Sequence, residues 1–284
     1  MKILDSAVLR LRAAGIESPR LEARLLLAHA AGASQVDIVA GRIVPDAEGL
    51  ARLDRLLERR IAHEPLAYIF GRREFWSLDF AVGPGVLIPR PESETLVETA
   101  LRRFPERDER LQVLDLGTGS SCLLLAFLSE RKNAQGLGVD ISHDALDWAR
   151  RNAENLGLSE RVRFVRDDWG RALSEAFDVV FVNPPYVKSA DIGALAPELA
   201  AHEPAIALDG GLDGLEAYRT VASVLLPRLS ARGCIFLELG QGQAEAVSEI
   251  FTEAGFLVEG TVNDLARIKR CLVMVAAEQH SRQR

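Results

Sequence analysis

Hydrophobic residues recur at helical spacing through the first sixty residues of the chain. Leu, Ile, Val and Ala repeat every three to four positions, the period of an α-helix that buries one face. This spacing covers residues 3–14, 18–31, 34–40 and 46–62. Ser18-Pro19 matches an N-cap followed by proline at the first helical position, and Gly15 and Gly32 are typical of helix ends. The pattern predicts a small N-terminal helical bundle.

Beyond residue 90, short apolar runs alternate with amphipathic stretches. The predicted helices cover 92–103, 121–131, 143–156, 214–230 and 242–254. The predicted strands cover 111–116, 136–141, 161–166, 177–182, 233–239, 256–262 and 270–277, with a long loop after residue 182. This alternation predicts a doubly wound α/β sheet with helices on both faces.

The region between the two patterns has a different composition. From Pro65 to Pro91 it is richer in Gly, Pro and aromatic residues, and apolar side chains alternate around Phe80. Such alternation predicts a β-hairpin. We therefore expect a helical domain over 1–74, a hairpin linker over 75–90 and an α/β domain over 91–284.

Composition narrows the class of protein. The 284 residues are 48% hydrophobic and 26% charged, which is typical of a soluble globular chain. There is no apolar run of about 18 residues, and the N-terminus has no apolar signal-peptide core, so we expect a cytoplasmic protein. Three scattered cysteines without a C-x-x-C spacing indicate neither a zinc site nor disulfides.

Charge is divided unequally along the chain. Residues 1–90 carry a net charge of +2, whereas residues 91–284 carry −9. A protein that grips a long DNA backbone needs Lys and Arg to neutralise phosphates. The acidic α/β half therefore argues against such a function.

A glycine-rich loop follows the first strand of the α/β half. It reads Asp115-Leu116-Gly117-Thr118-Gly119-Ser120-Ser121 and opens a predicted helix. Glycines there allow a tight turn and a close approach of a ligand to the backbone. The spacing departs from a dinucleotide fingerprint, because Cys122 stands where G-x-G-x-x-G/A requires a small residue.

Two further strand ends carry acidic residues. Asp140 ends the next strand, about 20 residues after the loop, where a carboxylate is placed to bind ribose hydroxyls. The strand after it ends in Asp167-Asp168-Trp169. There, Asp168 could accept from an adenine amino group and Trp169 could stack on the ring. Taken singly, each acid could instead be a solvated loop residue or a helix cap.

The fourth strand end is the most informative. Asn183-Pro184-Pro185-Tyr186 follows the apolar strand 177–182. Two prolines form a stiff turn whose carbonyls stay free as acceptors, Asn183 adds a further carbonyl, and Tyr186 offers a ring face. This set suits a planar, uncharged NH2 group.

The order of these motifs resembles a class I S-adenosylmethionine-dependent methyltransferase that methylates amino groups. A longer match, over roughly residues 65–275, resembles the peptide chain release factor N5-glutamine methyltransferases. Besides the loop and Asn183 to Tyr186, the matching stretches are Arg73 to Trp76, Val86-Leu87-Ile88-Pro89-Arg90-Pro91-Glu92, Glu203-Pro204 and Ala207 to Leu215. Asn-Pro-Pro-Tyr is shared with adenine-N6 DNA methyltransferases, whereas Ile-Pro-Arg-Pro-Glu is more specific. Enzymes that methylate a ribosomal-protein glutamine resemble the chain less there, because their Arg is followed by Ser-Pro.

The resemblance implies a seven-stranded sheet with an antiparallel last strand and a helical N-terminus. We expect the helical domain 1–74 to dock the protein substrate, and the alternative is that it only stabilises the fold as a cap. It implies S-adenosylmethionine at Gly117, Thr118, Gly119, Ser120, Ser121, Asp140, Asp168, Trp169 and Asn183. It implies catalysis by Asn183, Pro184, Pro185 and Tyr186, with a release factor as the protein substrate and without a metal. The Asn183 side chain and the Pro184 carbonyl would hold both N–H groups of a Gly-Gly-Gln glutamine. Tyr186 would pack on the amide plane.

Two positions depart from the family pattern. Ser121 stands where the loop usually ends in Gly, and a serine resists φ above zero. Arg267 stands where the family commonly has Gly, and we expect it to alter a turn.

Three other functions remain open. The first two are an adenine-N6 nucleic-acid methyltransferase and a ribosomal-protein glutamine methyltransferase. The third is a non-catalytic protein that kept the fold. A nucleic-acid enzyme would need a basic groove and a target-recognition insertion, neither of which the sequence shows.

Overall fold

The computed structural model describes residues 2–277 and divides the chain into two compact units. The helical unit comprises Met1–Gly71 together with Ala196–His202. The sheet unit comprises Arg72–Leu195 and Glu203–Arg284. The helical unit thus ends close to the predicted boundary, but it also includes a segment from the predicted long loop.

Four helices of the helical unit confirm the N-terminal periodicity. They are α1 (Lys2–Ala13), α2 (Pro19–Ala31), α3 (Gln35–Val39) and α4 (Ala47–Ile61). Leu11, Leu26 and Leu57 are fully or almost fully buried between them. Gly32 ends α2 with φ +60°, a left-handed conformation that glycine adopts without strain.

Two short helices of the same unit escaped prediction: α5 (Leu66–Phe70) and α9 (Pro197–His202). The buried Arg60 guanidinium binds both Glu22 and Glu198, each at 2.6 Å. His202 Nε2 lies 3.0 Å from the Ala62 carbonyl oxygen. A helix of six residues carries little helical signal in its own sequence. Contacts with residues that are distant in sequence stabilise α9 instead.

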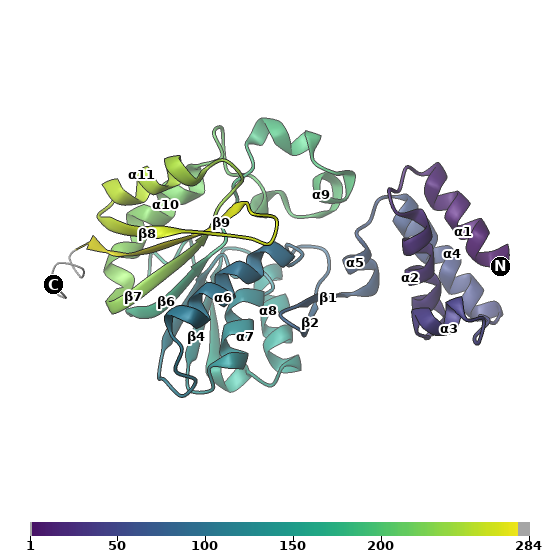
Figure 1. Ribbon diagram of the computed structural model, residues 1–284, viewed down its shortest axis with the longest axis horizontal. Coiled ribbons are helices and arrows are strands. Elements are labelled where there is room, and N and C mark those ends of the chain that lie inside the picture. Colours follow the sequence, from purple (N-terminus) through teal and green to yellow (C-terminus); the bar gives the residue numbers. More distant parts are fainter. Residues whose placement is uncertain (1, 278–284) are drawn as a thin grey trace. The chain divides into compact units, whose positions relative to one another are not determined.

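The sheet unit contains a hairpin and a seven-stranded sheet (Figure 1). The hairpin, β1 (Arg72–Phe75) and β2 (Leu78–Ala81), starts three residues before the predicted linker. Its two turn residues, Trp76 and Ser77, both have positive φ, as a two-residue hairpin turn with the twist of the strands requires.

The large sheet has the order β5-β4-β3-β6-β7-β9-β8. Its strands are β3 (Gln112–Leu116), β4 (Gln135–Asp140), β5 (Val162–Arg166), β6 (Phe177–Val182), β7 (Leu229–Glu238), β8 (Phe256–Asn263) and β9 (Lys269–Ala276). Strands β3 to β7 are parallel, and β9 runs antiparallel to β7 and β8. The predicted fold class and the antiparallel last strand are confirmed.

Helices cover both faces of this sheet (Figure 1). On one face lie α6 (Glu94–Arg103), α7 (Cys122–Glu130) and α8 (His143–Asn155); on the other lie α10 (Glu216–Leu225) and α11 (Ala244–Glu253). The predicted helix 214–230 is shorter than expected, because Pro227 lacks the N–H of a helix interior and the chain passes through a 3-10 turn. Strand β7 accordingly starts at Leu229 rather than at 233.

None of the helices within residues 2–277 is long and apolar enough to cross a membrane.

Candidate active site

A cavity of about 340 Å³ opens at the carboxyl edge of the sheet. The turns after β3, β4, β5 and β6 all line it, together with residues from segments 85–93, 204–209 and 216–220. Because β3 lies between β4 and β6, the strand order reverses there, which is where open α/β sheets bind ligands. Of the predicted residues, the following line the cavity: Gly117, Thr118, Gly119, Ser120, Asp140, Asp168, Trp169, Asn183 and Pro185.

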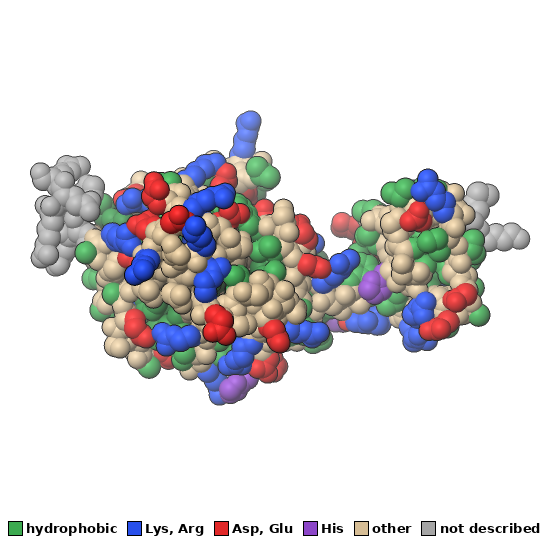
Figure 2. All heavy atoms as spheres, turned by 90° about the horizontal axis from the view of Figure 1, so that it is seen from below, with side chains coloured by type: hydrophobic (Ala, Val, Ile, Leu, Met, Phe, Trp, Pro, Cys, Tyr) green, Lys and Arg blue, Asp and Glu red, His purple; other side chains and the backbone are tan. Residues whose placement is uncertain are grey.

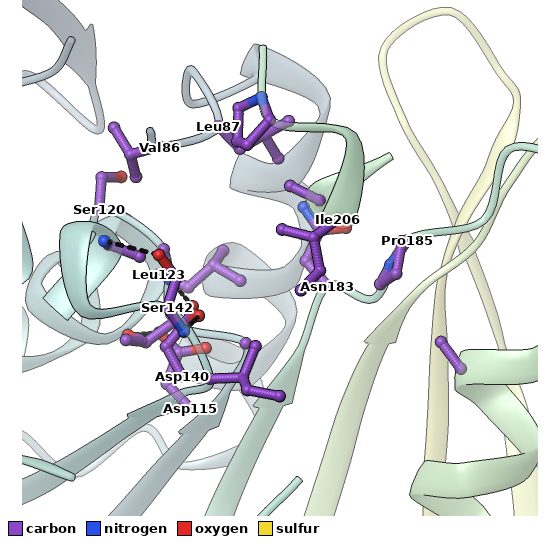
Figure 3. A pocket seen from close by; sticks show the side chains of 18 of the residues that line it. Val86, Leu87, Asp115, Ser120, Leu123, Asp140, Ser142, Asn183, Pro185 and Ile206 are labelled. Atoms are coloured by element: carbon purple, nitrogen blue, oxygen red, sulfur yellow. Dashed lines mark hydrogen bonds between the residues drawn. The ribbon is translucent and has the colours of Figure 1, made fainter. Parts of the chain in front are cut away.

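The cavity has two chemically different sides (Figure 3). The glycine-loop side consists of Asp115, Gly117 to Ser120, Asp140 and Ser142. The Asn183 side, which lies opposite, consists of Asn183, Pro185 and Ile206.

Backbone amides fix the glycine-loop side. The N–H groups of Gly117 and Thr118 both donate to the Val139 carbonyl, at 2.9 Å. The Asp140 carboxylate accepts from Gly119 N and from Ser142 N, also at 2.9 Å. Burial raises the pKa of Asp140, while these amide donors oppose the shift. Asp140 thus orders the loop and presents a carboxylate to the cavity.

Asp115 is a second acid on this side and, unlike the partly buried Asp140, it is buried. Thr118 Oγ1 donates to Asp115 Oδ2 at 2.6 Å. Burial, helped by the nearby charge of Asp140, raises the pKa of Asp115 to about 7. The residue belongs to the predicted loop motif, but no sequence pattern indicated a separate role for it.

Ser121 does not line the cavity. It is fully buried at the start of α7 with φ +65°, so this position requires the conformation that glycine favours. Among residues 2–277, its hydroxyl has no hydrogen-bond partner. The expected strain at this departure from the family pattern is therefore present. Arg267 has φ +63° in the β8–β9 turn, which confirms that its departure falls at a turn.

Trp169 and Asp168 follow β5. Trp169 faces the loop closely enough that a Cβ on Gly117 would lie 3.5 Å from the indole ring. Asp168 forms an ion pair with Arg171 at 2.9 Å, so its carboxylate both lines the cavity and binds a surface arginine.

On the Asn183 side, the four predicted catalytic residues are placed differently from one another. Asn183 and Pro185 line the cavity, whereas Pro184 and Tyr186 do not. Within the described chain, neither the Asn183 side chain nor the Pro184 carbonyl makes a hydrogen bond. The Tyr186 hydroxyl instead donates to Glu238 Oε1 at 3.3 Å.

Arg90 and Glu203 join two walls of the cavity. Arg90 Nη2 donates to Glu203 Oε1 at 2.6 Å, and Ile88 N donates to Glu203 Oε2 at 3.3 Å. The Glu203 side chain is buried, whereas Arg90 lines the cavity. Both belong to the matching stretches of the sequence, but only the fold shows that they form a pair.

Asn152 was not predicted at all. Fully buried on α8, it donates to the carbonyls of Ala81 and Ser120 and accepts from Ala81 N. It thereby ties the hairpin to the glycine loop. An asparagine inside a helical pattern gives no signal of such a role.

Comparisons with known proteins agree with this geometry. Residues 2–71 match the family described as PrmC N-terminal domain, and residues 107–212 match a methyltransferase domain. The methyltransferase from Pyrococcus furiosus shares the fold, with a TM-score of 0.51, 20% identity, and coverage of 79% of this chain and 97% of that one.

Two relatives extend the match over almost the whole chain. Release factor glutamine methyltransferase from Caulobacter vibrioides is 43% identical over 277 residues, or 97% of this chain and 96% of the relative. The protein of the same name from Rhodospirillum rubrum is 43% identical over 274 residues, or 96% and 83% of the two chains. The chain therefore belongs to the release factor glutamine methyltransferase family.

Proposed function

We propose that this enzyme transfers a methyl group from S-adenosylmethionine to the side-chain amide nitrogen (N5) of the glutamine in the Gly-Gly-Gln motif of peptide chain release factors. The observation that carries the proposal is Asn183, whose amide faces the cavity without a hydrogen-bond partner among residues 2–277. A polar side chain left free at the edge of a buried strand is available to a substrate.

The cavity fits S-adenosylmethionine better than a dinucleotide. Asp115, which is buried, and Asp140, which is partly buried, line it, and carboxylates there favour a cationic ligand over a pyrophosphate. Gly117 to Ser121 would hold the methionine end, with Ser121 acting through the turn. Asp140 would bind the ribose, and Asp168 and Trp169 the adenine. When bound, S-adenosylmethionine supplies a methyl group already activated on a sulfonium.

The acceptor needs orientation, because the lone pair of an amide nitrogen is delocalised into its carbonyl. Asn183 Oδ1 would accept one N–H of the glutamine, and the Pro184 carbonyl, which has no partner among residues 2–277, would accept the other. Holding both hydrogens directs the nitrogen at the methyl group, and positioning of this kind can supply up to ~7–11 kcal/mol. Pro185, which lines the cavity, would pack against the amide. That Tyr186 packs there as well stays a prediction.

Methylation of a purified release factor tests the function directly. We expect label from S-adenosylmethionine on the wild-type factor and none on a factor whose Gly-Gly-Gln glutamine is replaced by alanine. Duplex DNA and ribosomal protein serve as competing acceptors. Preferential labelling of either would contradict the proposed substrate.

No described feature favours the nucleic-acid alternative. On the face seen in Figure 2, basic and acidic side chains are intermingled over the sheet unit. The α/β half carries a net charge of −9. An enzyme acting on the amide of a protein loop needs no phosphate-binding groove, and we expect it in the cytoplasm, where translation ends.

We further propose that the helical unit docks a remote part of the same factor. Several of its apolar side chains are exposed, among them Val36, Val39 and Val44, each by more than 60%. Val39→Asp should raise KM for the whole factor while leaving KM for a short Gly-Gly-Gln peptide unchanged. The peptide is the internal control, and equal effects on both substrates would reduce the unit to a structural cap.

A further inference from the structure

Glu238 is a buried acid to which the proposed mechanism assigns no task. It ends β7, and its exposed fraction is 1%. In the parallel pairing of β6 and β7, Val182 lies opposite Leu237. One step further, Glu238 therefore comes beside Asn183 at the carboxyl edge of the sheet.

Both carboxylate oxygens of Glu238 are engaged by hydroxyl groups of site segments. Oε1 accepts from the Tyr186 hydroxyl at 3.3 Å, and Oε2 accepts a short hydrogen bond from Ser93 Oγ. Ser93 lines the cavity and follows directly after Pro91-Glu92. One carboxyl group thus joins the Ile-Pro-Arg-Pro-Glu segment to the Asn-Pro-Pro-Tyr turn.

Burial of the Glu238 carboxyl group lowers the stability of the fold. Glu238 forms no ion pair within residues 2–277, and the nearby Arg270 binds Asp264 and the Leu239 carbonyl instead. Burial raises the pKa of Glu238. Burying a carboxylate without a paired cation costs stability, and acids with shifted pKa values cluster at functional sites, so the presence of Glu238 beside the cavity indicates a functional role.

A second set of contacts holds the same tyrosine from its backbone. Gln243 Nε2 donates to the Tyr186 carbonyl at 3.1 Å. The Tyr218 hydroxyl lies 3.1 Å from the Glu238 carbonyl oxygen and 3.3 Å from Gln243 Oε1. Gly240 leaves room for this packing, since a Cβ there would lie 3.1 Å from the Tyr186 ring and 2.1 Å from Gln243 Oε1. Tyr186 is therefore fixed at both its hydroxyl and its carbonyl.

We propose that Glu238 is a positioning residue for methyl transfer: it fixes Tyr186, and through Tyr186 it fixes the turn from which Asn183 and the Pro184 carbonyl face the acceptor amide. This inference rests on the proposed function. Glu238 itself does not line the cavity and acts on the Asn183 side only. Because the proposed catalysis depends on orientation, a small rotation of this turn slows the transfer without weakening cofactor binding.

The test weakens the same link from each partner, with Glu238→Gln and Tyr186→Phe. Glu238→Gln removes the charge and leaves one carboxamide oxygen for two hydroxyl donors, and Tyr186→Phe removes one of those donors. Each change should lower kcat on the release factor by about 10- to 100-fold, the range expected for a hydrogen bond to a charged group. The dissociation constant for S-adenosylmethionine should stay within about twofold. The double variant should be about as slow as the slower single variant, because the two residues act as one unit.

Asp178→Asn is the matched control. Asp178 is a buried acid at the opposite end of β6, bound to Gln112 N, Ser230 and Arg232. Its replacement should lower the melting temperature and leave kcat unchanged. If Glu238→Gln and Tyr186→Phe keep kcat within about twofold, or if their kcat losses are additive, the inference is wrong.

Hydrogen exchange separates this inference from the choice of substrate. In the free protein, the Val187 amide donates to the Leu208 carbonyl at 3.0 Å. Glu238→Gln should speed exchange at Tyr186 to Lys188, and Asp178→Asn should not. Unchanged exchange there would contradict the positioning role, whatever protein the enzyme methylates.

Discussion

The glycine-loop side and the Asn183 side of the cavity are built by different means. On the first, the ligand groups come from neighbouring strand ends, and backbone amides within the same turns hold them in place. On the second, the Asn183 side chain has no hydrogen-bond partner in the described part of the chain, and the turn that carries it is held by side chains from β7 and from the start of α11. The glycine-loop side is thus a local structure, whereas the Asn183 side depends on tertiary contacts.

This difference separates binding from turnover. A change on the glycine-loop side should alter cofactor affinity, and a change on the Asn183 side should alter the rate of transfer.

Replacement of Asn183, the proposed acceptor-binding residue, should have the largest effect. We expect Asn183→Ala to lower kcat about 1000-fold, since it removes an orienting acceptor used in the transition state. Asn183→Asp should be milder, because a carboxylate still accepts hydrogen bonds. Steady-state kinetics at saturating cofactor measures both, and an Asn183→Ala enzyme with near-normal kcat would refute the proposed role.

The buried acid of the glycine-loop side should make stability depend on pH. Below about pH 4, Asp115 is neutral in both the folded and the unfolded chain. Between pH 4 and 7, the unfolded chain ionises while the folded chain keeps the proton, because the folded pKa is about 7. Stability should therefore fall as pH rises, by up to ~4 kcal/mol relative to Asp115→Asn. Denaturant titrations of both cofactor-free proteins at pH 4 and 7 would show it, and parallel curves would contradict it.

Loss of the predicted ribose ligand should weaken binding without stopping turnover. Asp140→Ala removes the carboxylate that accepts from Gly119 N and faces the cavity. We expect cofactor affinity to fall by roughly 1–3 kcal/mol, the scale of a hydrogen bond to a charged group. Calorimetry with S-adenosylmethionine, and with NAD as a control ligand, measures this. Unchanged affinity in the variant, or binding of NAD to the wild type, would rule out the assignment.

The smallest effect concerns Ser121. Glycine at this position removes both the strain of φ +65° and a buried hydroxyl without a partner in the described chain. Ser121→Gly should raise the free energy of unfolding by about 1 kcal/mol and keep or improve cofactor affinity. A marked loss of affinity would show instead that the hydroxyl contacts the ligand.

The same contrast explains what the sequence could predict. Strand β6 and the loop after β3 were found because apolar runs and glycines are local signals, and the residues that follow them meet at one edge of a parallel sheet. Glu203, Glu238 and Gln243 were not assigned, since nothing near them in sequence shows what they contact. Helix α9 was missed for the same reason, because its Glu198 is held by Arg60, 138 positions away.

A single-turnover titration shows whether the two sides of the cavity act separately. Transfer to the release factor is followed at increasing S-adenosylmethionine concentrations for the wild type, Asn183→Ala and Asp140→Ala. We predict that Asn183→Ala lowers the limiting rate with an unchanged half-saturating concentration. Asp140→Ala should raise the half-saturating concentration with a nearly unchanged limiting rate. If each variant changes both the limiting rate and the half-saturating concentration, the two sides form one unit, and the proposed separation of binding from turnover is wrong.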